Sequence, residues 1–122
     1  MARVLVADDA SFMRQMIREI VEAEGHEVVG EASDGDEVVE EFKRLHPDVV
    51  TMDIVMPRRS GIDAVKGIME LDTGACVVMC SALGQETLVQ EALQAGAQDF
   101  IVKPFKPDAV VATLKKVLEK AE

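Results

Sequence analysis

Short apolar runs alternate along the chain with longer segments in which apolar residues recur every three or four positions. A short continuous apolar run is typical of a buried strand, and the three-to-four spacing is typical of an amphipathic helix. The runs predict strands over 4–7, 28–29, 49–53, 76–80 and 100–102. The spaced segments predict helices over 12–21, 38–45, 62–69, 88–93 and 110–118. The residues that close the first four helices are Gly25, Pro47, Gly74 and Gly96.

Five strand–helix units in succession predict an α/β fold. Right-handed crossovers between such units give a parallel sheet with helices on both faces. The fully apolar first, third and fourth strands agree with strands that are covered on both sides. A chain of 122 residues suits one domain with one core. The pattern alone leaves the lateral order of the strands open.

Polar side chains follow four of the predicted strands at the point where each strand ends. Asp8 and Asp9 follow the first strand, and Asp53 ends the third. Ser81 follows the fourth strand and Lys103 follows the fifth. Ligands of open parallel sheets bind outside the carboxyl ends of the strands, so these side chains are expected to converge there.

Three carboxylates with one lysine outline a phosphoryl-transfer site. Carboxylates are the ligands that Mg²⁺ uses together with water and phosphate oxygens, and an aspartate can itself accept a phosphoryl group. Taken singly, each residue has an ordinary interpretation: an aspartate after a strand often caps a helix, and an exposed lysine is usually only solvated. The shared position at one edge is what favours a metal–phosphate site.

Charge and composition limit the possible binding partners and the cellular compartment. The formal net charge is −10, which argues against nucleic acid or an anionic membrane as a direct partner. No apolar run approaches the ~20 residues of a membrane span, and no secretory signal opens the chain. Cys76 and Cys80 are predicted to be buried free thiols in a reducing cytosol, so a cytoplasmic location is expected.

Four segments of the chain resemble the receiver domains of two-component response regulators. The segments are Val6–Arg14, Val50–Pro57, Met79–Gln85 and Gly96–Phe105. Within that family, the chain is most similar to the stand-alone chemotaxis regulators of the CheY type. The resemblance implies one receiver domain over residues 1–122, without an output domain. It also implies a doubly wound, flavodoxin-like sheet with strand order 2-1-3-4-5 and five helices.

The resemblance assigns the phosphoacceptor and the metal ligands. Asp53 is expected to accept the phosphoryl group. Asp9 is expected to bind Mg²⁺ directly and Asp8 through water, with Asp53 and the backbone carbonyl of Val55 as further ligands. Mg²⁺ is therefore the expected cofactor.

The resemblance also assigns a switch. Lys103 is expected to pair with the phosphoryl oxygens, and its bond to Pro104 is cis in the family. The Ser81 hydroxyl is expected to turn onto the phosphoryl group. Phe100 occupies the switch aromatic position, where it carries no hydroxyl.

The implied function is a signalling protein that assists its own phosphorylation and dephosphorylation, not an enzyme with a separate substrate. The expected partners are a chemotaxis-type histidine kinase, a downstream motor or motor-adaptor protein, and a phosphatase where one exists. The protein is expected to be a monomer. The alternative within the family is a phosphorelay intermediate that passes phosphate to another histidine protein.

Three other functions fit the sequence less well. A haloacid-dehalogenase-type phosphatase would need two acids spaced by one residue, but Asp8 and Asp9 are adjacent. A flavin-binding or redox module would need a hydroxyl-rich phosphate loop after the first strand, where this chain has acids. A degenerate receiver is disfavoured by the complete acid set and Lys103.

Overall fold

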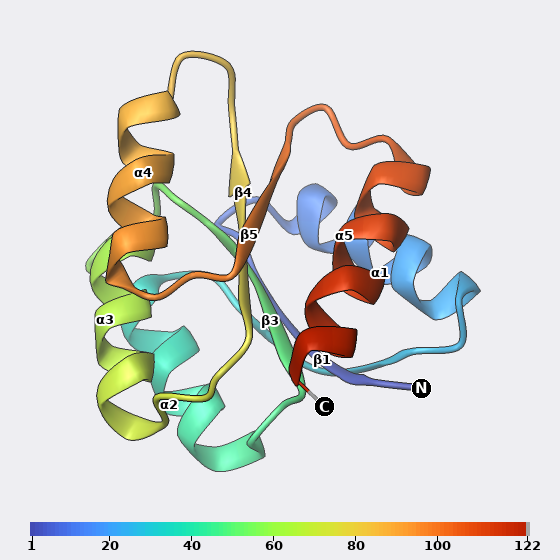
Figure 1. The fold of residues 1–122 in the computed structure, drawn as a ribbon, viewed down its shortest axis with the longest axis horizontal. Coiled ribbons are helices and arrows are strands. Elements are labelled where there is room, and N and C mark those ends of the chain that lie inside the picture. The colour runs from blue at the N-terminus through green and yellow to red at the C-terminus, as the bar shows by residue number, and fades with distance from the viewer. Residues whose placement is uncertain (122) are drawn as a thin grey trace.

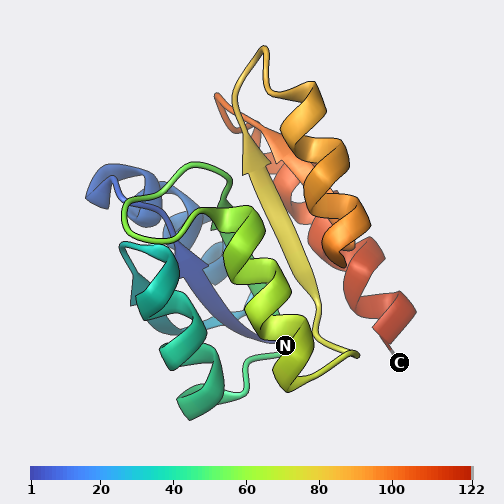
Figure 2. The same ribbon diagram turned by 90° about the vertical axis from the view of Figure 1, so that its left-hand side faces the viewer.

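The computed structural model describes residues 1–121, and its ribbon is shown from two sides in Figures 1 and 2. The strands are β1 (Arg3–Ala7), β2 (Glu27–Ala32), β3 (Val49–Asp53), β4 (Val77–Ser81) and β5 (Asp99–Val102). The helices are α1 (Ser11–Ala23), α2 (Gly35–Leu45), α3 (Gly61–Leu71), α4 (Glu86–Ala95) and α5 (Pro107–Ala121). Residue 122, the last of the expected domain, lies outside the described residues.

The strands form one parallel sheet in the order β2-β1-β3-β4-β5, which confirms the implied topology. Ala7 at the end of β1 pairs with Met52, and Ser81 at the end of β4 pairs with Val102. The strands therefore finish at nearly the same level. The chain leaves β1 toward β2 and later returns to β3 on its other side, so the switch point of the topology lies between β1 and β3.

The sheet has a core on each face. Helices α1 and α5 cover one face, and α2, α3 and α4 cover the other (Figures 1 and 2). Successive side chains of a strand point to opposite faces, so β1 supplies Val4 and Val6 to the first core and Leu5 and Ala7 to the second. β1, β3 and β4 are buried almost throughout, as their unbroken apolar runs predict.

The helix ends follow the predicted stop signals with one exception. Gly25 and Gly96 have φ of 85° and 128° just after α1 and α4, a backbone conformation that favours glycine. Before Pro47, His46 ends α2 with φ of 46°. α3 stops at Leu71, three residues before Gly74, because the Asp72 carboxylate accepts the Gly74 N–H at 2.9 Å and forms a turn. Among the described residues, no helix is long and apolar enough to cross a membrane.

Both cysteines are free and buried, as predicted. Burial raises the pKa of the Cys76 thiol to about 11, and burial also raises the pKa of Cys80. Both thiols are therefore neutral at physiological pH. A neutral buried thiol is a poor nucleophile and a poor metal ligand, which leaves the chemistry to the carboxyl edge of the sheet.

Candidate functional site

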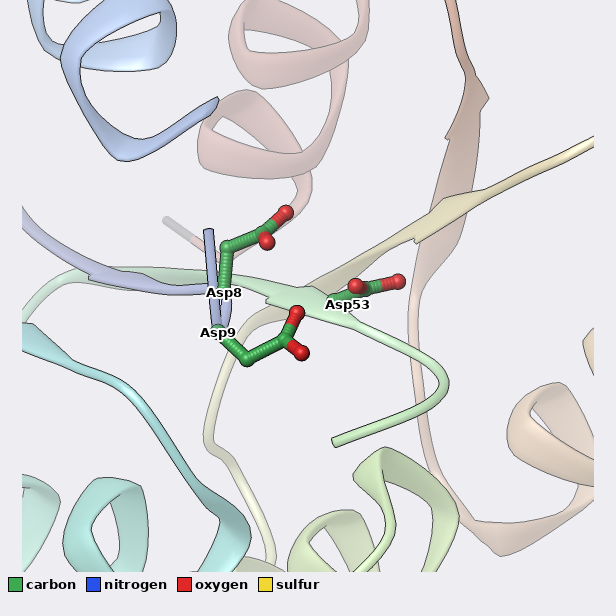
Figure 3. Close-up of side chains that lie close together, drawn as sticks. All are labelled: Asp8, Asp9 and Asp53. Carbon is green, nitrogen blue, oxygen red and sulfur yellow. The ribbon is translucent and has the colours of Figure 1, made fainter. Parts of the chain in front are cut away.

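Three carboxylates meet at the switch point of the sheet. Asp8 and Asp9 directly follow β1, and Asp53 ends the neighbouring strand β3 (Figure 3). Ligand atoms of the three side chains all lie within 4.8 Å of one another. Asp8 and Asp53 are buried, whereas Asp9 is exposed. The cluster thus has a buried floor and one side open to solvent.

Lys103 joins the two buried carboxylates. Its Nζ lies 3.0 Å from Oδ2 of Asp8 and 3.2 Å from Oδ2 of Asp53. Burial alone would lower the pKa of Lys103, but the hydrogen bond to Asp8 and the charges of Asp53 and Asp8 outweigh it and raise that pKa. The ammonium group is therefore charged at neutral pH and can face an anion at this edge of the sheet.

The two buried carboxylates differ in how many of their oxygens have a polar partner. Oδ1 of Asp8 accepts the backbone N–H of Ala10 at 2.9 Å, and Oδ2 accepts from Lys103. Asp53 contacts Lys103 through Oδ2, and no described residue donates a hydrogen bond to its Oδ1. Asp53 therefore keeps an oxygen that can attack an electrophile, whereas both oxygens of Asp8 are occupied.

Ser81 lies beside this cluster on the next strand. It is the last residue of β4, and its backbone carbonyl accepts the Lys103 N–H at 2.7 Å. A cavity of about 130 Å³ lies next to it, and the lining includes Ser81, Leu83, Val89 and Phe100. Phe100 as a whole residue is 38% exposed and lies at the rim of that space.

The structure brings Asp8, Asp9, Asp53 and Lys103 together as the sequence predicts. The peptide between Lys103 and Pro104 is cis, as the resemblance implies. Val55 lies two residues past Asp53 in the loop before α3, and its side chain is exposed. The roles that the resemblance assigns to these residues, and to Ser81 and Phe100, stay predictions.

Arg14 makes a polar contact with the site that was not predicted from the sequence. Its Nη1 donates to the backbone carbonyl of Asp8 at 2.7 Å, and its Nε pairs with Glu31 at 2.9 Å. An arginine in the first turn of a helix gives no sign of such a contact. Glu31 near the end of β2 can be related to the site only once β2 is known to lie beside β1.

A family model for the response regulator receiver domain matches residues 4–115. The chain belongs to this family. It is 56% identical to a chemotaxis protein CheY of Thermotoga maritima over 94% of this chain and 96% of that protein. It is 52% identical to a chemotaxis protein CheY of Bacillus subtilis over 95% of this chain and 97% of that protein. This receiver domain is therefore of the CheY type, the subgroup expected from its motifs.

The fold of the receiver domain also matches solved structures. The CheX-CheY-BeF3-Mg+2 complex from Borrelia burgdorferi contains a chain that is 40% identical, with a TM-score of 0.90. The match covers 94% of this chain and 87% of that one. The same doubly wound sheet is thus present in a relative of known structure.

Asp53 should make the stability of the protein depend on pH. Burial raises the pKa of Asp53, and the charge on Asp8 adds to the rise against the opposing effect of Lys103. The folded state therefore holds this proton more tightly than the unfolded state, and ionisation of Asp53 costs stability as the pH rises above about 4. In chelator, Asp53→Asn should raise the melting temperature at pH 7 and give progressively less gain toward pH 4.

The matched control for this pH dependence is Asp63→Asn, because Asp63 is exposed in the first turn of α3. Thermal melts of the three proteins across pH 4–7 provide the measurement. An Asp53→Asn gain that is equal at both ends of the range would contradict the raised pKa.

Proposed function

We propose that this protein is a stand-alone phosphorylatable switch of chemotaxis. It takes a phosphoryl group from a chemotaxis-type histidine kinase onto Asp53 and then binds a motor or motor-adaptor protein. It acts as a monomer in the cytoplasm. The proposal rests on one observation: Lys103 bridges Asp8 and Asp53 inside a three-carboxylate cluster. The two CheY relatives described above support the chemotaxis assignment.

The chemistry proposed for Asp53 is a direct displacement at phosphorus. A carboxylate oxygen of Asp53 forms an O–P bond while the P–N bond to the kinase histidine breaks. The electron pair of that bond leaves on the imidazole nitrogen. Lys103 is placed to neutralise a phosphoryl oxygen, and to do so it exchanges its present contact with Asp53 for one with the phosphoryl group. The product is an acyl phosphate on β3.

The carboxylate cluster fits a magnesium ion. Its ligand atoms are hard oxygens from Asp8, Asp9 and Asp53 within 4.8 Å of one another, and the exposed side leaves room for water. The Val55 carbonyl is the proposed fourth protein ligand. When bound, Mg²⁺ neutralises charge on the transferring phosphoryl group.

The proposed switch couples Asp53 to the surface around Phe100. A phosphoryl group on Asp53 would accept a hydrogen bond from the Ser81 hydroxyl and draw it inward. The cavity of about 130 Å³ beside Ser81 gives the half-exposed Phe100 ring a place to turn into. The surface formed by α4, β5 and α5 then changes shape, so a partner can read the phosphorylation state.

The decisive test of the proposal is phosphorylation from a small donor. The protein is incubated with acetyl phosphate in Mg²⁺ or in chelator, and its intact mass is measured. We expect the mass of one phosphoryl group to be gained with Mg²⁺ and little or none in chelator. A gain that proceeds equally in chelator, or no gain at all, would refute the proposed function. Onward transfer to a purified histidine protein would instead favour the phosphorelay alternative.

Ser81→Ala should separate phosphorylation from signalling. The variant keeps Asp53 and Lys103, so it should still accept phosphate. It lacks the hydroxyl that couples the phosphoryl group to Phe100, so it should lose most of the roughly 5- to 150-fold gain in partner affinity that such local coupling provides. Titration with the motor or adaptor protein of the same chemotaxis system checks this. Full phosphorylation dependence in Ser81→Ala would contradict the switch.

A further inference from the structure

Arg14 contacts the peptide that carries the two adjacent carboxylates of the site. The Asp8 carbonyl belongs to the peptide unit that links Asp8 to Asp9, and Arg14 Nη1 donates to this oxygen at 2.7 Å. We infer that Arg14 is a positioning residue that fixes the Asp8–Asp9 peptide and so sets the affinity of the site for a divalent cation. This inference rests on the proposed function.

The Arg14 side chain is itself held in place. It is only 18% exposed, and its Nε donates to Oε1 of Glu31 at 2.9 Å. Glu31 receives a second arginine, Arg18, whose Nη2 lies 2.5 Å from Oε2. The hydrogen bond from Arg18, together with Arg14, lowers the pKa of Glu31 and keeps it a carboxylate at neutral pH. A fixed anion on β2 therefore anchors the guanidinium group that reaches Asp8.

Asp8 is fixed by the same strand through its backbone. Its N–H donates to the carbonyl of Ala32 at 3.0 Å, one residue past Glu31 on β2. The Asp8 side chain is held by Ala10 and Lys103. The exposed Asp9 carboxylate is different, because no described residue is hydrogen-bonded to it. Its direction is thus set mainly by the peptide plane before it, and Arg14 holds that plane.

Only an arginine can make both contacts at once. The guanidinium group is planar and carries several N–H donors, so Nε can donate to Glu31 while Nη1 donates to the Asp8 carbonyl. A lysine at position 14 would keep the charge but present a single ammonium group. Arg14→Lys should therefore lose much of the positioning effect even though the local charge is unchanged.

The direction in which Mg²⁺ affinity changes on removal of Arg14 distinguishes a positioning role from a simple electrostatic one. Arg14 is a cation near a cation site, so its removal lowers the repulsion that Mg²⁺ meets and would by charge alone tighten binding. Loss of positioning would instead weaken Mg²⁺ binding. Partners outside the coordination shell typically change metal affinity by 10- to 100-fold when removed, so we expect Arg14→Ala to weaken Mg²⁺ binding about 10-fold.

Arg18 provides the matched control. It pairs with Glu31 and with Glu22 but does not contact Asp8. Arg18→Ala removes the same charge from the same helix and the same partner on β2, one helical turn further from the site. Both variants should lose similar thermal stability in chelator. Only Arg14→Ala should lose Mg²⁺ affinity.

The experiment is calorimetric titration of Mg²⁺ into wild type, Arg14→Ala, Arg14→Lys and Arg18→Ala below their melting temperatures. If Arg14→Ala does not fold, Arg14→Lys carries the same test.

The outcomes are distinguishable. Weaker Mg²⁺ binding in both Arg14 variants, with wild-type affinity in Arg18→Ala, would establish the positioning role. Unchanged or tighter binding in the Arg14 variants, or equal weakening in Arg18→Ala, would overturn it and leave the proposed function standing. A wild-type protein that binds no Mg²⁺ would overturn the proposed function and this inference together.

Discussion

Asp53→Asn should abolish phosphoryl uptake from acetyl phosphate, whereas Asp8→Asn should only slow it. The difference follows from the oxygens of the two side chains. Asp53 has an oxygen to which no described residue is hydrogen-bonded, so it can attack phosphorus, while both oxygens of Asp8 accept hydrogen bonds. Asparagine lacks the anionic oxygen that forms the acyl phosphate, so the reaction at position 53 has no substitute nucleophile.

Asp8→Asn tests the same buried cluster without removing the acceptor. It weakens the metal site and the pairing of Lys103, which should slow phosphorylation by about 10- to 100-fold. The measurement is a time course of intact mass at saturating acetyl phosphate and Mg²⁺, followed by peptide mapping of the modified residue. Uptake that survives in Asp53→Asn would show that another residue accepts the phosphoryl group, and uptake that is lost in Asp8→Asn alone would place the acyl phosphate on Asp8 instead.

Gly61→Ala should be among the most destabilising single substitutions in the protein. Gly61 begins α3 and packs against the end of β3, where its N–H donates to the Ile54 carbonyl at 2.7 Å. A Cβ atom at position 61 would lie 2.1 Å from the Asp53 carbonyl oxygen and 2.9 Å from Cα of Ile54. These neighbours are backbone atoms and cannot rotate away, so the strand end that carries Asp53 would have to move. We expect a loss of about 3 kcal/mol or more.

Gly74→Ala is the control for this substitution. A Cβ atom there would meet only Oδ1 of Asp72, at an ordinary contact distance of 3.4 Å. Replacement of a compatible glycine restricts the unfolded chain and typically stabilises by about 0.4–1 kcal/mol. Urea denaturation of both variants gives the comparison. Similar unfolding free energies for Gly61→Ala and Gly74→Ala would show that the close approach at β3 is not needed for stability.

The sequence predicted the fold to the extent that the fold is encoded locally. Short apolar runs located each strand and helical spacing located each helix, and β3 has the predicted bounds. β2 is longer than its Val28–Val29 centre because it is an edge strand with half-buried polar and glycine positions that dilute the apolar signal. The lateral order of the strands came from the family resemblance, since periodicity describes a strand's faces and not its neighbours.

The candidate site was predictable where its residues end apolar runs. Asp8 and Asp53 follow or end buried strands, and Lys103 follows the short apolar run of β5, and such positions are conspicuous in a sequence. Arg14 and Glu31 belong to a helix and an edge strand with mixed polarity, where a charged residue is ordinary. Their connection to the site depends on the docking of α1 beside β2, which is a tertiary property.

The contact between Lys103 and Asp8 joins residues that are 95 positions apart in the chain. During synthesis Asp8 and Asp53 therefore leave the ribosome long before Lys103, which bridges them, and the cluster stays incomplete until β5 has been made and has docked. A nascent chain, or one cut by a protease before residue 103, would carry Asp53 without its counter-charge. The carboxylate cluster would thus gain its bridging ammonium group only after β5 has been synthesised and has docked.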